Sequence, residues 1–282
     1  MQSPWAPDPS DKQSVQLFAP GLVSTDADET AIAFSFNSDT CVFVRDGKLR
    51  AMRLLNTYWS ADEALLADDR FEYRSPSFGP DGTLYFSSNR PDSPDGGPAD
   101  FDIFRMRPQA EGWSEPRRVA ELNSSADEDS PSLDEQGSMY FTSNRPDKLE
   151  NGKGDYDVFR AQFIGDRFLH PLKLGNAINT AADELHVYIA ATGRAMVVER
   201  SAPSAPTSAD LSLIVMRNDV WSQDVPVSDV VNTKYNEGRP TMGGPQRWIY
   251  FSSDRPTDAA DTQADNNIYL VDFYTFTGAK RQ

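Results

Sequence analysis

The sequence predicts an all-β fold, a five-bladed β-propeller whose blades are four-stranded antiparallel sheets. The main observation is an internal repeat, because S-P-S-F-G-P-D-G-T-L-Y-F-S-S-N-R-P at 75–91 returns as S-P-S-L-D-E-Q-G-S-M-Y-F-T-S-N-R-P at 130–146. A third copy keeps only the end of the unit, W-I-Y-F-S-S-D-R-P at 248–256. Units recur every ~40 to 55 residues with room for four strands each, and no segment keeps the helical period of about 3.6 residues.

The start of each unit is marked by a glutamate at the end of a connector. The connectors align without a gap at 17–29, 116–128, 172–184 and 225–237, and each has an aliphatic residue six positions before its glutamate. Leu66 holds that aliphatic position before Glu72. The predicted unit starts are therefore Glu29, Glu72, Glu128, Glu184 and Glu237.

Each unit contains four short stretches typical of strands. The first runs from the glutamate to a large apolar residue, and a turn such as Pro80-Asp81-Gly82 leads into a second strand rich in β-formers. Third strands are expected at 49–54, 102–106, 157–161, 211–216 and 267–272. The fourth begins at an aromatic residue, which is Trp59, Trp113, Phe168 or Trp221 in the first four units.

The two ends of the chain predict how the ring closes. The fifth unit stops after its third strand, near 273–277, while a spare strand at 15–18 precedes the first connector. We expect this strand to complete the last blade, which removes an exposed sheet edge. The chain then has an extended segment at 1–14, one propeller domain at 15–278 and a tail at 279–282. The predicted blades are 29–66, 72–120, 128–176, 184–229, and 237–278 with 15–18.

The repeat residues resemble those of the TolB-type β-propeller family of bacteria. The resemblance rests on the F-x-P-D-G-x-L-Y-F-x-S-x-R core at 78–90, on D-I-F at 102–104 and on G-W-S-E-P at 112–116. It covers nearly the whole chain, but units one and four lack the Pro-Asp-Gly turn. It implies the propeller fold and an extracytoplasmic binding or accessory module.

Composition excludes several classes of partner. Lys and Arg number 27 against 43 Asp and Glu, for a formal charge of -16, and no basic run could neutralise several phosphates, so nucleic acid and anionic membrane surfaces are poor partners. Cys41 is the single cysteine, which rules out an internal disulfide. No apolar stretch reaches the ~18 residues of a membrane span. We expect a monomer.

The first residues carry no signal peptide, because 1–9 are proline-rich and lack a basic start and an apolar core. The protein is expected to be periplasmic or secreted if a leader was removed, and otherwise cytoplasmic.

Each unit also has an arginine 16 to 18 positions after its glutamate, at the end of the second strand. In an antiparallel hairpin these two positions are adjacent, so an ion pair is expected in every blade. The predicted pairs are Glu29–Arg45, Glu72–Arg90, Glu128–Arg145, Glu184–Arg200 and Glu237–Arg255. Fivefold repetition favours a role in stability over a ring of charges that binds a ligand.

Ligand binding is expected where the units differ. First strands carry Arg74, Asp129, His186, Tyr188 and Arg239 at positions that are small in other copies. Around one channel mouth these side chains could hold an anionic or sugar-like ligand, or they could simply fill the channel. Of these, His186, Tyr188 and Asp129 are the weak candidates for catalysis.

The long acidic loops at 91–101, 146–156 and 256–266 are expected on the same face as the glutamates. Asp92, Asp95, Asp100, Asp102, Asp155 and Asp157 could supply oxygen ligands to calcium, although none has EF-hand spacing. No other cofactor is expected.

The sequence lacks the G-x-S-x-G, H-E-x-x-H, P-loop and G-x-G-x-x-G motifs. We therefore expect a non-catalytic module that binds a protein, peptide or carbohydrate through the acidic-loop face. The alternative is a carbohydrate-active hydrolase or lyase at the channel mouth, with His186 as acid or base.

Overall fold

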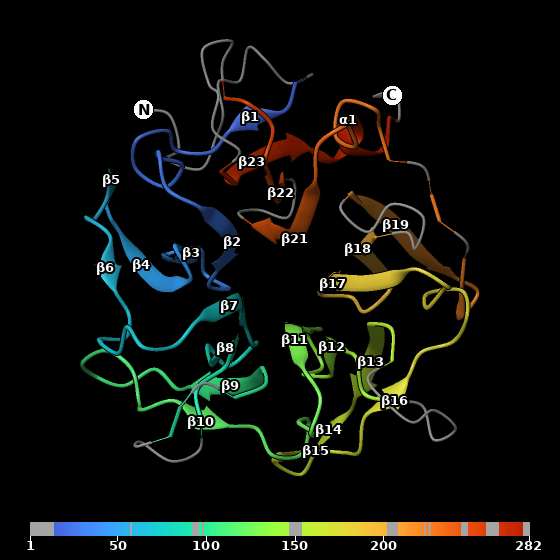
Figure 1. Ribbon diagram of the computed structural model, residues 1–282, viewed down its shortest axis with the longest axis horizontal. Coiled ribbons are helices and arrows are strands. Elements are labelled where there is room, and N and C mark those ends of the chain that lie inside the picture. Colours follow the sequence, from blue (N-terminus) through green and yellow to red (C-terminus); the bar gives the residue numbers. More distant parts are fainter. Residues whose placement is uncertain are drawn as a thin grey trace.

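The computed structural model describes residues 14–56, 58–91, 96–97, 99–146, 154–201, 208–222, 224–225, 227–243, 248–257 and 265–278. Five antiparallel sheets stand around one central axis, as Figure 1 shows. The innermost strands of the sheets contact one another around this axis. The predicted all-β, five-bladed propeller is confirmed.

The strands follow one another from the axis outward in every blade. Blade 1 contains β2 (Glu29–Phe34), β3 (Thr40–Arg45) and β4 (Lys48–Leu55), with β5 (Tyr58–Trp59) and β6 (Glu63–Ala64) pairing with β4. Blade 2 contains β7 (Tyr73–Phe78), β8 (Leu84–Ser88), β9 (Asp102–Met106) and β10 (Arg117–Arg118). Blade 3 contains β11 (Glu128–Leu133), β12 (Met139–Ser143), β13 (Asp157–Ala161) and β16 (Leu172–Lys173). Blade 4 contains β17 (Asp183–Ile189), β18 (Ala195–Ser201), β19 (Ala209–Arg217) and β20 (Val220–Trp221).

Blade 5 is built from both ends of the chain. It contains β21 (Glu237–Gly243), β22 (Trp248–Ser253) and β23 (Asn267–Asp272), and its outermost strand is β1 (Gln16–Leu17). Gln16 lies opposite Leu270 in this antiparallel pair, and the N–H of Phe18 donates to the carbonyl of Ile268 at 2.8 Å. The segment after β23 forms α1 (Phe273–Thr277). No helix in the described part of the chain has the length and apolar character of a membrane span.

Two fourth strands differ from the sequence prediction. In blade 3, Phe168 belongs to an additional hairpin of β14 (Phe163–Ile164) and β15 (Arg167–Phe168), and the outer strand is β16. In blade 2, Trp113 forms only an isolated bridge with Pro108, ahead of β10. In blades 2 and 3 the aromatic residue therefore precedes the outer strand, whereas Trp59 and Trp221 lie within β5 and β20.

The hydrophobic core lies between neighbouring blades. Phe18 and Phe34, from blades 5 and 1, both pack against Tyr250, with ring centroids 5.1 Å and 4.7 Å away. Because the apolar side chains are used between sheets, polar residues are left to line the axis. The inner strands also carry bulges near their glutamate ends, and Ser75, Ser130 and Arg239 have positive φ angles of 47°, 55° and 48° at equivalent positions.

Candidate functional site: the central channel

Four of the five predicted ion pairs are present at the glutamate ends of the inner strands. The four glutamates are fully buried, and the closest N–O distances are 2.7, 3.0, 3.1 and 2.8 Å for Glu29–Arg45, Glu128–Arg145, Glu184–Arg200 and Glu237–Arg255. Each carboxylate also accepts the backbone N–H and the hydroxyl of a Ser or Thr four residues earlier. These bonds tie each blade to its connector.

The pair predicted between Glu72 and Arg90 is wrong. In blade 2 the inner-strand position of the buried glutamates is taken by Tyr73, which lies opposite Ser88. Glu72 stands one residue earlier and is exposed, and it pairs with Arg74 at 2.9 Å. The guanidinium of Arg90 instead lies over the ring of Phe104, 5.7 Å from its centroid. The one-residue offset turns the Glu72 side chain away from the hairpin.

The centre of the channel holds a buried cluster of charged side chains. Nδ1 of His186 lies 2.7 Å from Oε2 of Glu199, and Nε2 of His186 lies 3.8 Å from Oδ2 of Asp129. An ionised carboxylate can only accept a hydrogen bond, so Nδ1–H is the donor to Glu199. Nε2 is buried and has no hydrogen-bond partner. The three residues are each at most 8% exposed.

The charges around the cluster keep both acids ionised. Burial alone would raise the pKa of Asp129, but the charges of His186, Arg239 and Arg74 hold that pKa below its usual value. Burial opposes ionisation of Glu199 as well, and the charge and hydrogen bond of His186, together with Arg239, lower its pKa. The cluster thus joins Asp129, His186 and Arg239, as the sequence predicted, while Arg74 acts from a distance and stacks over Phe101 at 3.7 Å.

Little space is left beside this cluster. A narrow cavity of about 30 Å³ is lined by His186, Arg239 and Tyr188, among others, which is enough for ordered water but not for a larger ligand. Tyr188 faces the other end of the channel, and burial raises its pKa. Of the five predicted ligand-binding residues, Asp129, His186 and Arg239 therefore lie in the charged centre. Tyr188 faces the opposite mouth, and Arg74 is in neither place.

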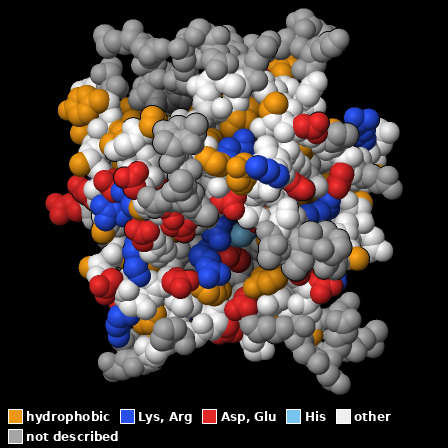
Figure 2. All heavy atoms as spheres, turned by 45° about the horizontal axis from the view of Figure 1, so that its top comes forward, with side chains coloured by type: hydrophobic (Ala, Val, Ile, Leu, Met, Phe, Trp, Pro, Cys, Tyr) orange, Lys and Arg blue, Asp and Glu red, His pale blue; other side chains and the backbone are white. Residues whose placement is uncertain are grey.

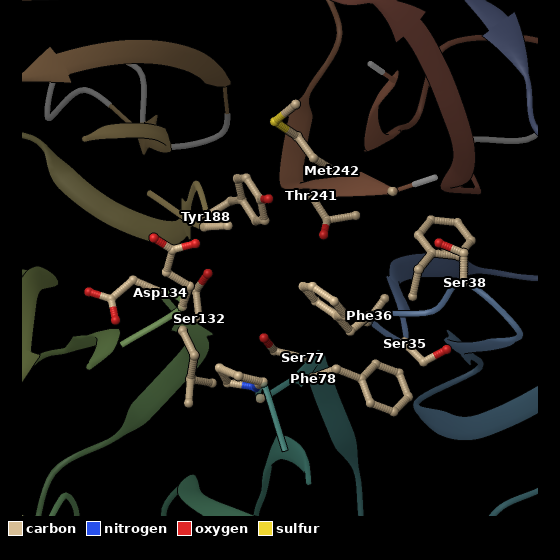
Figure 3. A pocket seen from close by; sticks show the side chains of 18 residues that line it. Ser35, Phe36, Ser38, Ser77, Phe78, Ser132, Asp134, Tyr188, Thr241 and Met242 are labelled. Carbon is tan, nitrogen blue, oxygen red and sulfur yellow. The ribbon is translucent and has the colours of Figure 1, made fainter. Parts of the chain in front are cut away.

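That opposite mouth contains a larger pocket of about 320 Å³. It lies at the turns between first and second strands, and residues from all five blades line it. Blades 1 to 5 follow one another counterclockwise in Figure 1 and clockwise in Figure 3, so the two figures show opposite faces of the propeller. The pocket therefore opens on the face turned away from the viewer in Figure 1. We call this the turn face and the cavity the axial pocket. Figure 3 shows Ser77, Ser132, Tyr188 and Thr241 around the opening, with Phe36 reaching in from blade 1.

The axial pocket combines hydroxyl groups with aromatic surface. Ser77, Thr241 and Tyr188 supply hydroxyls, while Phe78 and the 80% exposed Phe36 supply rings. The described part of the lining contains the acids Asp134 and Glu135 and no Lys or Arg. A pocket with a few polar groups on an apolar wall suits a small polar ligand or the side chains of a peptide.

The glutamate face has a different character. Figure 2 shows basic and acidic side chains interspersed over the middle of this side of the molecule. Parts of the three predicted acidic loops, with Asp92 and Asp95, lie outside the described residues. Asp102 pairs with Arg118 at 2.6 Å, and Asp157 pairs with Lys173 at 2.6 Å.

Calcium binding stays a prediction. Within the described ranges, no three His, Cys, Asp or Glu side chains are grouped so as to hold a metal ion, and this covers Asp100 and Asp155. Asp102 and Asp157 already have cationic partners, as given above.

Sequence reasoning missed three residues. Glu199 lies in β18 opposite His186, where equivalent positions are Val44, Ser87, Thr142 and Ser252. An acid at this place in one unit alone was a detectable signal. Phe36 and Glu135 lie in turns, and their place beside the pocket depends on how the blades pack around the axis.

Comparisons with known proteins show the fold. No family model matches the chain, and no curated protein matches it. Among solved structures, a TolB-like protein from Agrobacterium tumefaciens is 13% identical, with a TM-score of 0.55 over 90% of this chain and 79% of that one. A luciferin-regenerating enzyme is 11% identical, with a TM-score of 0.51 over 95% of this chain and 99% of its own. At such identities, what this chain shares with these two proteins is the β-propeller fold.

Proposed function

We propose that this propeller is a non-catalytic binding module and that the axial pocket of the turn face is its ligand site. The observation that carries the proposal is the pocket itself. Its volume of about 320 Å³ is within the range of small-molecule sites, and its lining comes from the ends of the inner strands and the turns beside them. Hydroxyl groups for hydrogen bonds and aromatic rings for stacking are both available there.

Binding is favoured over catalysis because both carboxylates of the channel, Asp129 and Glu199, already face His186. Glu199 bonds to His186 and to the N–H of Arg239, and Asp129 lies beside the same imidazole. A general acid or base must reach a proton of the substrate within hydrogen-bond distance. The cavity of about 30 Å³ at His186 has no room for a sugar ring beside this cluster.

The alternative, a hydrolase or lyase, has weaker support. A glycosidase needs two carboxyl groups on opposite sides of a substrate-sized space. Asp129 and Glu199 instead flank His186, and in the axial pocket Asp134 accepts the backbone N–H groups of Gln136 and Ser138 within its own turn. The acidic-loop face is not required for the proposed site.

The proposal can be tested by saturation-transfer difference NMR on the full chain. The probes are glucose, N-acetylglucosamine, glycerol and the tripeptide Gly-Tyr-Gly. At least one should receive saturation from the wild-type protein and lose it in Thr241→Phe, which fills the pocket. Thr241→Val keeps the shape of the side chain and should retain the signal. Equal signals in Thr241→Phe and the wild type would overturn the proposal.

A further inference from the structure

A second cavity adjoins the axial pocket on the turn face. It has a volume of about 210 Å³ and lies between blades 2 and 3. Pro80, Leu133 and Glu135 line both cavities, so the two lie next to each other at these residues. We call the second cavity the side pocket. A ligand that lies across these residues can contact both cavities.

The wall of the side pocket is aromatic. Phe163 and Phe168 of the β14–β15 hairpin meet edge to face, with centroids 5.0 Å apart and planes at 60°. Phe168 meets Tyr85 of blade 2 in the same way, at 6.2 Å and 75°. The hairpin also leaves apolar surface exposed, with Phe163 at 37% and Ile164 at 56%. These rings provide a site of amino-acid size for an apolar side chain.

The charge at the junction of the two pockets is negative. Asp81, Asp134 and Glu135 line one or both cavities, and among the described residues neither lining contains Lys or Arg. Asp81 and Asp134 accept hydrogen bonds within their own turns. Glu135 is exposed, and its carboxylate accepts only from the side-chain amide of its neighbour Gln136 at 2.9 Å. It is therefore available to an incoming cation.

We infer that the ligand of this face is an extended peptide carrying a Lys or Arg next to an aromatic or large aliphatic residue. The apolar side chain occupies the side pocket, the cation pairs with Glu135, and adjoining residues reach the hydroxyl groups of the axial pocket. This inference rests on the proposed function. A peptide fits better than a small amine, because two cavities of different character lie on either side of one carboxylate.

The inference is tested with three fluorescein-labelled peptides, GSKFSG, GSEFSG and GSKSSG, by fluorescence polarisation on the full chain. GSKFSG should bind about tenfold more tightly than either of the others. GSEFSG lacks the charge-assisted contact with Glu135, and GSKSSG lacks the buried ring. Glu135→Gln should weaken GSKFSG binding by about tenfold without affecting GSEFSG. Phe163→Ala should weaken both peptides that contain Phe. Asp166→Asn, in the same hairpin but in neither lining, is the matched charge control and should change nothing.

The outcomes separate this inference from the proposed function. If all three peptides bind equally and Thr241→Phe abolishes binding, the peptide class is wrong while the axial site stands. If GSKFSG binding is lost in Glu135→Gln but kept in Thr241→Phe, the side pocket stands and the axial site is wrong. Absence of binding by GSKFSG overturns the inference, and the small polar probes then decide the proposed function alone. Because Glu135 is exposed, its Gln variant is expected to fold.

Discussion

Oε2 of Glu199 receives both Nδ1–H of His186, at 2.7 Å, and the backbone N–H of Arg239, at 2.8 Å. One buried carboxylate thereby connects blade 4 to blade 5 inside the channel. Asp129 of blade 3 stands on the other side of the imidazole, 3.8 Å from Nε2. Three of the five blades meet at this cluster, which closes the channel between its two mouths.

The first prediction concerns acid stability. The pKa values of Asp129 and Glu199 are lowered in the folded protein, so the stability they contribute is present above their unfolded values of about 4. It is lost as the pH falls from about 4 through the folded values. Thermal midpoints measured from pH 7 to pH 2 should therefore drop less steeply below pH 4 in the double variant Asp129→Asn, Glu199→Gln than in the wild type. An exposed control, Glu121→Gln, should follow the wild-type curve. Parallel curves for all three proteins would contradict this.

The second prediction concerns Gly238, which faces the Glu199 carboxylate. A Cβ at position 238 would lie 2.6 Å from Cδ of Glu199, so the carboxylate would have to leave His186. Gly238→Ala should lower the free energy of unfolding by about 1–3 kcal/mol in urea titrations. In a Glu199→Ala background the same change should cost much less. Gly175→Ala, with open space around it, is the control; a similar loss at both glycines would reject the steric account.

The third prediction concerns the N-terminal strand. Phe18 follows β1, is 5% exposed, and packs against Phe34 and Tyr250. Phe18→Ala should cost about 3–5 kcal/mol of unfolding free energy, because it opens a cavity between blades 5 and 1. The same change at Phe36, which is 80% exposed, should cost less than about 0.5 kcal/mol. Equal effects would mean that the strand adds little to the fold.

The five-bladed fold could be predicted from the sequence, because residues that recur in every unit mark the same backbone positions in every blade. A glutamate with Ser or Thr four residues before it is satisfied within one blade, as at Glu128 and Ser124, so its place can be recognised from one unit and carried to the next. The repeat pattern gave the wrong ion pair at Glu72, because a one-residue shift in blade 2 puts Tyr73 at the position that a buried glutamate holds in the other blades. Such a shift cannot be seen from the pattern of residue types.

The candidate site was only partly predictable, because it depends on contacts between blades. His186 and Asp129 were recognised as departures from the repeat, and they do lie together. Glu199 was missed because it lies on a second strand, which repetition had marked as scaffold. The pocket on the turn face was missed because its lining comes from strand ends and turns of different blades, and blade packing sets how closely these approach the axis.

The central proposal separates two roles: the buried glutamate–arginine pairs stabilise the propeller, and the axial pocket of the turn face binds the ligand. A single paired measurement tests it most directly: thermal midpoint and saturation-transfer binding of the four small probes, on Glu128→Gln and Thr241→Phe. Glu128→Gln removes a buried charge from Arg145 and should cost about 3 kcal/mol or more in stability, with probe binding retained below the midpoint. Thr241→Phe should keep its midpoint within a few degrees and lose probe binding. Lost binding in Glu128→Gln while it remains folded, with binding intact in Thr241→Phe, would contradict the claim.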